Sequence, residues 1–296
     1  MEPIQRIHHI SATVGDPNEN LQFYRDVLGL RLVKKTVNFE DNGTYHLYFA
    51  NEDADDGTIM TFFPLSNNLH GRVGAGQVRR IAFAIPKGTL TYWKNQLEIH
   101  DVSSIEDSTF GAPALFFNDP HNLSIALVES EIEKANQNIL GFYGVELLSE
   151  KPDETLKQLL NEMGLNLLQV EDDYYHLEMV GTERHKVLVN RKMIKRGRLG
   201  IGTVHHIAWS IPDESELEEY KSFFEKKKSA VTDIRDRKYF ESVYFKDPGQ
   251  IIYELATVGP GFTVDEPLDQ LGHTLMLPEQ YEKHRDEIEA KLPKLK

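Results

Sequence analysis

The chain has 296 residues, of which 40% are hydrophobic and 27% charged, and its formal net charge is -14. This length can bury a substantial core, and the acidic balance argues against a general affinity for nucleic acid or anionic membranes, which are bound through clustered Lys and Arg. Cysteine is absent, so thiolate chemistry is excluded and His, Asp and Glu remain as metal ligands. No apolar run approaches the ~20 residues of a membrane helix and no signal peptide is visible, which predicts a cytoplasmic protein.

The first unit of the chain, residues 5–65, has the pattern of a β-α-β-β-β module. Its opening strand ends at Asp16-Pro17, which is typical of a helix start. Leu21, Tyr24 and Leu28 then recur at helical spacing. Three strand-like runs complete the unit, at 31–39, 44–50 and 58–64.

The same pattern recurs three more times along the chain. The second unit begins at 78–85, the third spans 140–190 and the fourth runs from 202 to 255. The matching turns Asp119-Pro120 and Asp247-Pro248, each before a final strand, argue against accidental similarity. The pattern predicts an α+β fold of four βαβββ modules paired into two half-barrels, because a single module cannot bury its own sheet.

A polar, helix-prone connector at 129–138 marks the best domain boundary. The predicted domains are 1–130, with modules one and two, and 138–258, with modules three and four. The C-terminal extension 259–296 lies outside the repeat, and a charged helix is expected in it near 278–291. The basic run 191–198 is interpreted as a solvated connection between modules.

A pair of histidines opens two strands almost two hundred residues apart, His8-His9 and His205-His206. Since successive strand residues face opposite sides of a sheet, one member of each pair can point into a cavity. Alternation places His8 and His205 with apolar residues that are expected to pack under a helix. It places His9 and His206 with small or polar residues, which makes these two the better candidates for metal ligands.

The last strand of the fourth module carries a carboxylate, Glu254, between apolar neighbours. Ile251, Tyr253 and Leu255 form its predicted packing face, and Glu254 falls on the cavity face. An unpaired charge buried there would be costly, so a metal is the expected partner. Two histidines and one carboxylate leave coordination positions open, which suits a non-haem Fe(II) oxygenase.

A fourth protein ligand is not predicted in the first module. Alignment of residues 57–62 on 249–254 places Phe62 opposite Glu254, and the second module has Ala126 there. A four-ligand site would instead indicate isomerase chemistry through metal-bound water.

With these residues placed, the chain resembles the vicinal oxygen chelate superfamily, which includes glyoxalase, bleomycin-resistance proteins and extradiol dioxygenases. Within it, the chain is most similar to ring-cleaving dioxygenases of the hydroquinone type. The resemblance covers nearly the whole chain, and its specific parts are HHISATVGD at 8–16, FYRDVLGLRLVKKTVNFED at 23–41, GTVHHIAWSIPD at 202–213 and RDRKYFESVYFKDPGQIIYELAT at 235–257.

The resemblance implies metal ligands at His9, His206 and Glu254, in agreement with the alternation argument. Because these residues come from the first and fourth modules, modules one and four are expected to share the metal-bearing half-barrel. Around the metal the resemblance implies a further group of residues, namely His8, His205, Arg237, Tyr244 and, where relatives carry threonine, Ser11. The acid-base histidine of catechol enzymes has no match at 52–58, which favours a para-diol substrate.

The predicted function is therefore Fe(II)-dependent ring cleavage of a hydroquinone-type diol by O2, with Mn(II) as the alternative metal and a role in aromatic catabolism or detoxification. Tyr244, with His8 or His205, would exchange protons with the ring oxygens, while Arg237 would stabilise negative charge. A packed strand aromatic remains the simpler interpretation of Tyr244, and a surface ion pair with Asp236 or Glu241 that of Arg237.

Two other functions stay open at this point. One is a glyoxalase-like metal-dependent isomerase or thiol transferase, and the other is a resistance protein that binds an aromatic compound. A homo-oligomer is compatible with the sequence, and neither nucleic acid nor membrane is an expected partner.

Overall fold

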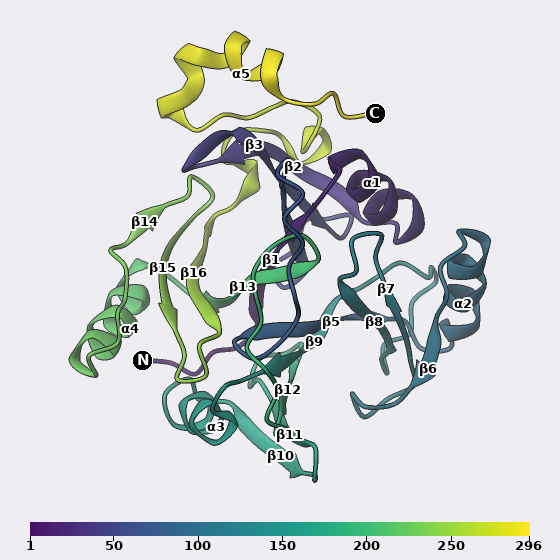
Figure 1. The fold of residues 1–296 in the computed structure, drawn as a ribbon, viewed down its shortest axis with the longest axis vertical. Coiled ribbons are helices and arrows are strands. Elements are labelled where there is room, and N and C mark those ends of the chain that lie inside the picture. Colours follow the sequence, from purple (N-terminus) through teal and green to yellow (C-terminus); the bar gives the residue numbers. More distant parts are fainter.

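The computed structural model describes residues 1–296 and consists of two eight-stranded mixed sheets (Figure 1). Sheet 1 contains, in spatial order, β14 (Arg235–Asp236), β15 (Phe240–Lys246), β16 (Ile252–Pro260), β13 (Thr203–Ile211), β1 (Ile7–Val14), β4 (Ile59–Pro64), β3 (Asp41–Ala50) and β2 (Arg31–Asn38). Sheet 2 contains β10 (Asn166–Val170), β11 (Tyr174–Glu178), β12 (Lys186–Asn190), β9 (Gly141–Leu148), β5 (Gln77–Ile85), β8 (Ser124–Glu129), β7 (Ala114–Asn118) and β6 (Ile105–Asp107).

The strand order confirms the predicted pairing of the modules. Strands of the first and fourth modules make up sheet 1, and strands of the second and third make up sheet 2. The junction in sheet 1 is the antiparallel pair β1 and β13, which lie side by side in Figure 1 although one is purple and the other green. The division of the chain into the ranges 1–130, 138–258 and 259–296 stays a prediction.

One helix follows the first strand of each module. The helices are α1 (Pro17–Gln22) continued by the π-helix η1 (Phe23–Val27), α2 (Leu90–Ile99), α3 (Pro152–Asn161) and α4 (Glu214–Lys226). The Asp16 carboxylate caps α1 by accepting hydrogen bonds from the backbone N–H groups of Asn18 and Glu19. None of the helices combines the length and the apolar character that a membrane span requires.

The alternation of residues in the last strand is confirmed. Ile251, Tyr253 and Leu255 belong to the large core cluster that the helices cover. Ala256, which alternates with them, lies in a second, smaller cluster on the other side of sheet 1, together with Ala208 and Ile59. The inner face of sheet 1 therefore carries its own apolar lining, and Glu254 is on that face.

The connector at 129–138 is not helical, in contrast to its predicted tendency. Glu129 ends β8 and the following residues form bends without helix. Their hydrogen bonds go to neighbouring segments: Ser130 N–H donates to Ile85 O, and Ile132 O accepts from Lys87 N–H. Contacts with sheet 2 thus replace the local hydrogen bonds of a helix.

The C-terminal segment, residues 259–296, crosses the open side of sheet 1 and is the yellow chain at the top of Figure 1. It includes three 3-10 turns, η2 (Phe262–Val264), η3 (Leu268–Gln270) and η4 (Glu279–His284), and the predicted charged helix appears as η4 followed by α5 (Arg285–Lys291). Met276 N–H donates to Lys35 O on β2, and Gly261 N–H donates to Tyr239 O beside β15. The segment therefore connects the two ends of sheet 1.

The basic run 191–198 lies in the connection between β12 and β13, as interpreted from the sequence. It runs beside the connection between β4 and β5, with isolated bridges from Arg198 to Arg72 and from Arg196 to Ala75. Arg196 also forms an ion pair with Glu150, at 3.3 Å.

Candidate metal centre

His9, His206 and Glu254 converge on the inner face of sheet 1 from β1, β13 and β16. Their ligand atoms lie within 4.8 Å of one another. His206 Nε2 is 2.8 Å from Glu254 Oε2, His9 Nε2 is 3.2 Å from the same oxygen, and the two Nε2 atoms are 3.3 Å apart. Strand register explains the convergence, because His9 and Glu254 both pair with Ala208 of the strand between them.

A hydrogen bond between ring nitrogens orients His9. His8 Nε2 lies 3.1 Å from Thr257 O, and because a carbonyl only accepts, this nitrogen carries the proton. In the neutral ring His8 Nδ1 is then an acceptor, and His9 Nδ1, 2.8 Å away, donates to it. The remaining nitrogen of His9, Nε2, keeps its lone pair and points to the centre of the cluster, as metal-ligating histidines require.

The second histidine pair repeats this geometry. His205 Nδ1 and His206 Nδ1 are 2.8 Å apart, so that His206 Nε2 faces the cluster. Burial and the neighbouring imidazole lower the pKa of His8 to about 3 and that of His205 to about 4. Burial also lowers the pKa of His206. Neutral imidazoles are the form that binds a metal.

His8 and His205 do not pack under a helix, so the prediction from strand alternation is wrong for these two residues. The β1 to β13 ladder contains irregularities next to both residues, between the pairs of Ile7 and His9 and between those of Ser11 and Ala12. Each bulge adds a residue, so that the apolar neighbours keep their place in the core while the histidine turns to the inner face. His8 accordingly packs edge-on against Phe240, with ring centroids 5.0 Å apart.

Glu254 has the surroundings of a metal ligand. It is fully buried, and neither carboxylate oxygen has a hydrogen-bond partner outside the close contacts with the two histidines. Burial raises the pKa of Glu254, but His9 and His206 outweigh it and hold that pKa well below its usual value. A buried carboxylate without a donor is costly, and a cation held by one oxygen and two nitrogens would satisfy it. The three residues therefore fit a metal ion.

Tyr244 and Arg237 lie beside the cluster. Tyr244 on β15 pairs with Glu254 in the sheet, and its ring centroid is 5.5 Å from that of His206. Burial and the nearby Glu254 charge raise the pKa of Tyr244, which keeps the phenol protonated. The Arg237 side chain is 12% exposed and its guanidinium lies 5.5 Å from the Tyr244 ring centroid. Arg237 forms an ion pair with Glu40, at 3.3 Å, and not with Asp236 or Glu241, the partners of the alternative interpretation.

A small cavity of about 40 Å³ adjoins the cluster, with His9, His206 and Ser11 in its lining. It shares Arg237 and Tyr244 with a groove of about 520 Å³ that opens to the surface. The remaining residues common to both are Asn38, Glu40, Phe63 and His206. The cavity and the groove therefore adjoin at these shared residues.

Thr61, and not Phe62, occupies the position that corresponds to Glu254 in the first module. β4 pairs with β1 as β16 pairs with β13, and when His9 is aligned on His206, Thr61 falls on Glu254. Phe62 faces the helix-covered core. The aligned position was thus wrong by one residue, but the conclusion holds, because threonine adds no fourth carboxylate.

Several residues of the cavity were missed or left undecided by the sequence analysis. His46 and Tyr48 alternate with core residues of β3, so strand periodicity alone places both on the inner face. Glu40 lies in the turn between β2 and β3, and Phe240 packs on both His8 and His9. No local pattern marks these two, because their positions depend on contacts between distant segments.

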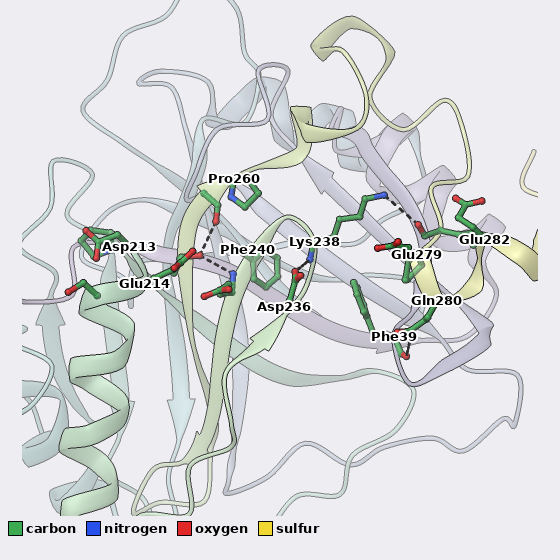
Figure 2. Close-up of a pocket in the computed structure, with 17 residues that line it drawn as sticks. Phe39, Asp213, Glu214, Asp236, Lys238, Phe240, Pro260, Glu279, Gln280 and Glu282 are labelled. Carbon is green, nitrogen blue, oxygen red and sulfur yellow. Dashed lines mark hydrogen bonds between the residues drawn. The ribbon is translucent and has the colours of Figure 1, made fainter.

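The largest surface groove, of about 1570 Å³, shares Phe39 and Phe240 with the lining of the cavity. Figure 2 shows that it is bounded by the start of α4, by the turn between β14 and β15 with the end of β16, and by the C-terminal segment. Its acidic lining includes Asp213, Glu214, Glu279 and Glu282. These carboxylates do not form a ligand cluster, since the single group of three convergent ligands in the chain is that of Glu254.

Paired βαβββ modules with two histidines and one carboxylate inside a half-barrel define a metal-binding class of fold. The family model described as "Glyoxalase/Bleomycin resistance protein/Dioxygenase superfamily" matches residues 6–255 of the chain. The protein therefore belongs to this superfamily, and the resemblance inferred from its motifs is confirmed.

Two relatives and two solved structures refine this assignment. A Bacillus subtilis (strain 168) protein named "Putative ring-cleaving dioxygenase MhqO" is 44% identical over 296 residues, covering 97% of this chain and 95% of that protein. The "Chlorohydroquinone/hydroquinone 1,2-dioxygenase" of Sphingobium indicum is 29% identical over 310 residues, covering 97% and 95%. A crystal structure of a "putative dioxygenase" from Bacillus subtilis has a TM-score of 0.96 at 42% identity, covering 100% of this chain and 99% of the other.

Glyoxalase I from Zea mays has a TM-score of 0.67 at 13% identity, covering 91% of this chain and 97% of the other. At this identity the likeness concerns the fold alone.

Proposed function

We propose that the protein is an Fe(II)-dependent ring-cleaving dioxygenase that acts on a dihydroxylated aromatic of the hydroquinone type. The observation that carries the proposal is the cluster of His9, His206 and Glu254, whose ligand atoms lie within 4.8 Å of one another beside a polar cavity. Two histidines and one carboxylate with open positions suit non-haem Fe(II). The names of the relatives at 44% and 29% identity point to the same chemistry.

His9, His206 and Glu254 would hold the iron, with Mn(II) as the alternative metal. A bound Fe(II) lowers the pKa of a coordinated hydroxyl and can react with O2. His8 and His205 keep the two ligand rings oriented through their Nδ1 contacts. Their predicted exchange of protons with the substrate stays a prediction, and the geometry favours the orienting role.

Tyr244 and Arg237 would act on the substrate oxygens. The protonated phenol of Tyr244 lies next to Glu254 and can donate to an oxygen of the diol in the cavity. The Arg237 guanidinium, at the junction of cavity and groove, would stabilise negative charge on the ring oxygens. Phe63 and Phe240 line the same cavity and would hold the aromatic ring between them.

The isomerase alternative is less well supported. A four-ligand site would need a carboxylate at the position of Thr61, which corresponds to Glu254 in the first module. A threonine hydroxyl is a weaker ligand for a divalent metal, so the protein offers three strong ligands on one side.

The test is anaerobic loading with Fe(II), followed by addition of O2 with hydroquinone or with catechol. We expect oxygen consumption and a ring-opened chromophore with hydroquinone. Absence of oxygen uptake with every dihydroxylated aromatic tried would contradict the proposed reaction.

Replacement of a ligand tests the centre itself. His206→Ala should reduce the bound iron from about one per chain to near zero, because two remaining protein ligands hold the ion weakly. His176→Ala is the matched control, since His176 lies on sheet 2 and contacts Glu171. Unchanged iron content in His206→Ala, measured by elemental analysis, would show that the ligand assignment is wrong.

A further inference from the structure

Four buried side chains of the first module form a continuous row of hydrogen bonds. Ser11 Oγ lies 2.6 Å from Thr61 Oγ1, which lies 3.0 Å from His46 Nε2. His46 Nδ1 lies 2.9 Å from the Tyr48 hydroxyl. Ser11 and Thr61 are fully buried, Tyr48 is 1% exposed and His46 is 8% exposed.

The strand register places this row directly beside the ligand cluster. Ser11 pairs with His206 on one side and with Thr61 on the other, and Thr61 pairs with Tyr48. Registered partners in neighbouring strands share one face of a sheet. Ser11 is therefore the member of the row that pairs with a metal ligand in the sheet, and Tyr48 is at the other end of the row of hydrogen bonds.

The internal repeat shows which side of the ion this row occupies. With His9 aligned on His206, Thr61 corresponds to Glu254, and the pairing of β3 with β4 then makes Tyr48 correspond to Tyr244. The row thus stands where a second carboxylate would stand if the first module carried one. Since threonine is there instead, this is the side on which a coordination position is left for a substrate oxygen.

The chemistry of the four groups sets the direction of the hydrogen bonds. A neutral imidazole nitrogen is a much stronger acceptor than a phenol oxygen, so the Tyr48 O–H donates to His46 Nδ1. Burial keeps the phenol protonated and the imidazole neutral, by raising the pKa of Tyr48 and lowering that of His46. His46 Nε2–H then donates to Thr61, and the Thr61 O–H donates to Ser11. The Ser11 proton is left without a partner in the row.

We propose that Tyr48, His46 and Thr61 form a directional hydrogen-bond chain that aims the Ser11 hydroxyl proton at the substrate oxygen beside His206. This inference rests on the proposed binding of an aromatic diol at the three ligands. Ser11 donates to the ionised oxygen of the diol, and His46 and Tyr48 are positioning residues that act through Ser11. No proton is transferred in this role, since the row supplies an oriented donor.

The test uses binding without turnover. The protein is loaded with redox-inert Zn(II), which accepts the same ligand types, and is titrated under argon with 4-nitrocatechol, whose ionised form absorbs visible light. A hydrogen bond to a charged oxygen predicts about 10- to 100-fold weaker binding in Ser11→Ala, with Ser11→Thr close to the wild type. Tyr48→Phe removes the donor to His46 Nδ1, so that the hydrogen bonds of the row can reverse their direction. The Ser11 hydroxyl can then donate to Thr61 instead of to the probe, and we expect about 2- to 10-fold weaker binding.

A double-mutant cycle identifies the route of the effect. If Tyr48 acts through Ser11, the variant carrying both substitutions binds the probe as Ser11→Ala does, within about twofold. Tyr45→Phe is the matched control, because Tyr45 lies on the same strand and donates to Pro293 O outside the row. Thr61→Val should weaken binding and Thr61→Ser should restore it, which separates a hydroxyl effect from loss of packing.

Additive effects of the Ser11 and Tyr48 substitutions would overturn the inference, as would unchanged binding in Ser11→Ala or absence of probe binding to the wild type. Zinc content, measured for each variant, distinguishes loss of the ion from loss of the hydrogen bond. Failure of the dioxygenase proposal is recognised separately, by the lack of oxygen uptake with Fe(II), while the coupling measured with Zn(II) remains unaffected.

Discussion

His8 determines which nitrogen of His9 is available to a cation. Its Nε2 is held by Thr257 O and its Nδ1 by His9, so the proton of His9 is confined to Nδ1. The ligand ring is thereby held in one tautomer and one orientation before any ion arrives. Such contacts behind a ligand commonly change metal affinity by about 10- to 100-fold.

We therefore expect His8→Leu to weaken Zn(II) binding by about 10- to 100-fold, because it leaves His9 Nδ1 without an acceptor. Affinity is measured by competition with a chromophoric chelator. His121→Leu, which removes another buried histidine in the turn between β7 and β8, should leave the affinity within about twofold of the wild type. An equal loss in both variants would indicate general destabilisation and contradict the orienting role.

The turns before the last strands of modules two and four are built alike. The Asp119 carboxylate accepts hydrogen bonds from His121 N–H and Leu123 N–H, both at 2.8 Å, and Asp247 accepts from Ile251 N–H at 2.7 Å. Burial raises the pKa of each carboxyl to about 6. The repeated Asp-Pro motif therefore serves the same turn in both sheets, at an electrostatic cost at neutral pH.

These turns predict a pH dependence of stability. A carboxyl with a raised pKa in the folded state binds its proton more tightly there than in the unfolded chain, so its contribution to stability is lost as pH rises from about 4 to about 6. The loss is on the order of 2 to 3 kcal/mol per carboxyl. The double variant Asp119→Asn, Asp247→Asn should gain stability relative to the wild type between pH 4.5 and pH 7. Urea denaturation at both pH values checks this, and a pH-independent difference would contradict it.

Most of the helices and strands could be predicted from the sequence alone. The helices through Leu21, Leu97 and Leu217 and the buried face of the last strand followed from local periodicity, which residues a few positions apart determine. The bulges that turn His8 and His205 inward were not predictable, because they arise from mismatched pairing between β1 and β13. The one-residue error at Phe62 has another cause, since the turn before the last strand is one residue longer at Gly249 than at Gly57 when Thr61 is matched to Glu254.

The site was predictable to a similar extent. His9, His206 and Glu254 were identified as convergent ligands because each lies in a repeated strand, and the structure brings their ligand atoms within 4.8 Å. The contact of Arg237 with Glu40 joins two turns 197 residues apart. No period in the sequence relates those turns, so only the folded structure reveals them.

At the scale of the whole molecule, the ion pairs of a buried lysine hold the C-terminal segment against sheet 1. Lys34 on β2 is fully buried, lies 2.6 Å from Asp265 and also pairs with Glu266. Phe262 and Leu271 of the same segment pack into the inner apolar cluster. The segment thus closes the side of the half-barrel that the strands leave open.

Lys34→Met should lower the free energy of unfolding by about 3 to 5 kcal/mol, because it leaves the buried Glu266 carboxylate without a cation, while Asp265 keeps its ion pair with Lys238. The double variant Lys34→Met, Glu266→Gln should regain part of this loss, since no buried charge is then left without a partner. Urea denaturation of the three proteins gives the comparison. A loss below about 1 kcal/mol in Lys34→Met would mean that the ion pairs of Lys34 contribute little to the stability of the fold.

The placement of β13 between β1 and β16 has a consequence for biosynthesis. His9 leaves the ribosome early, but His206 and Glu254 belong to the last third of the chain and are translated late. A nascent polypeptide stalled before the fourth module would hold an unpaired β1 edge and no chelating site. Binding of a metal ion at this site would therefore be a late event, which follows synthesis of nearly the entire protein and cannot guide its early folding.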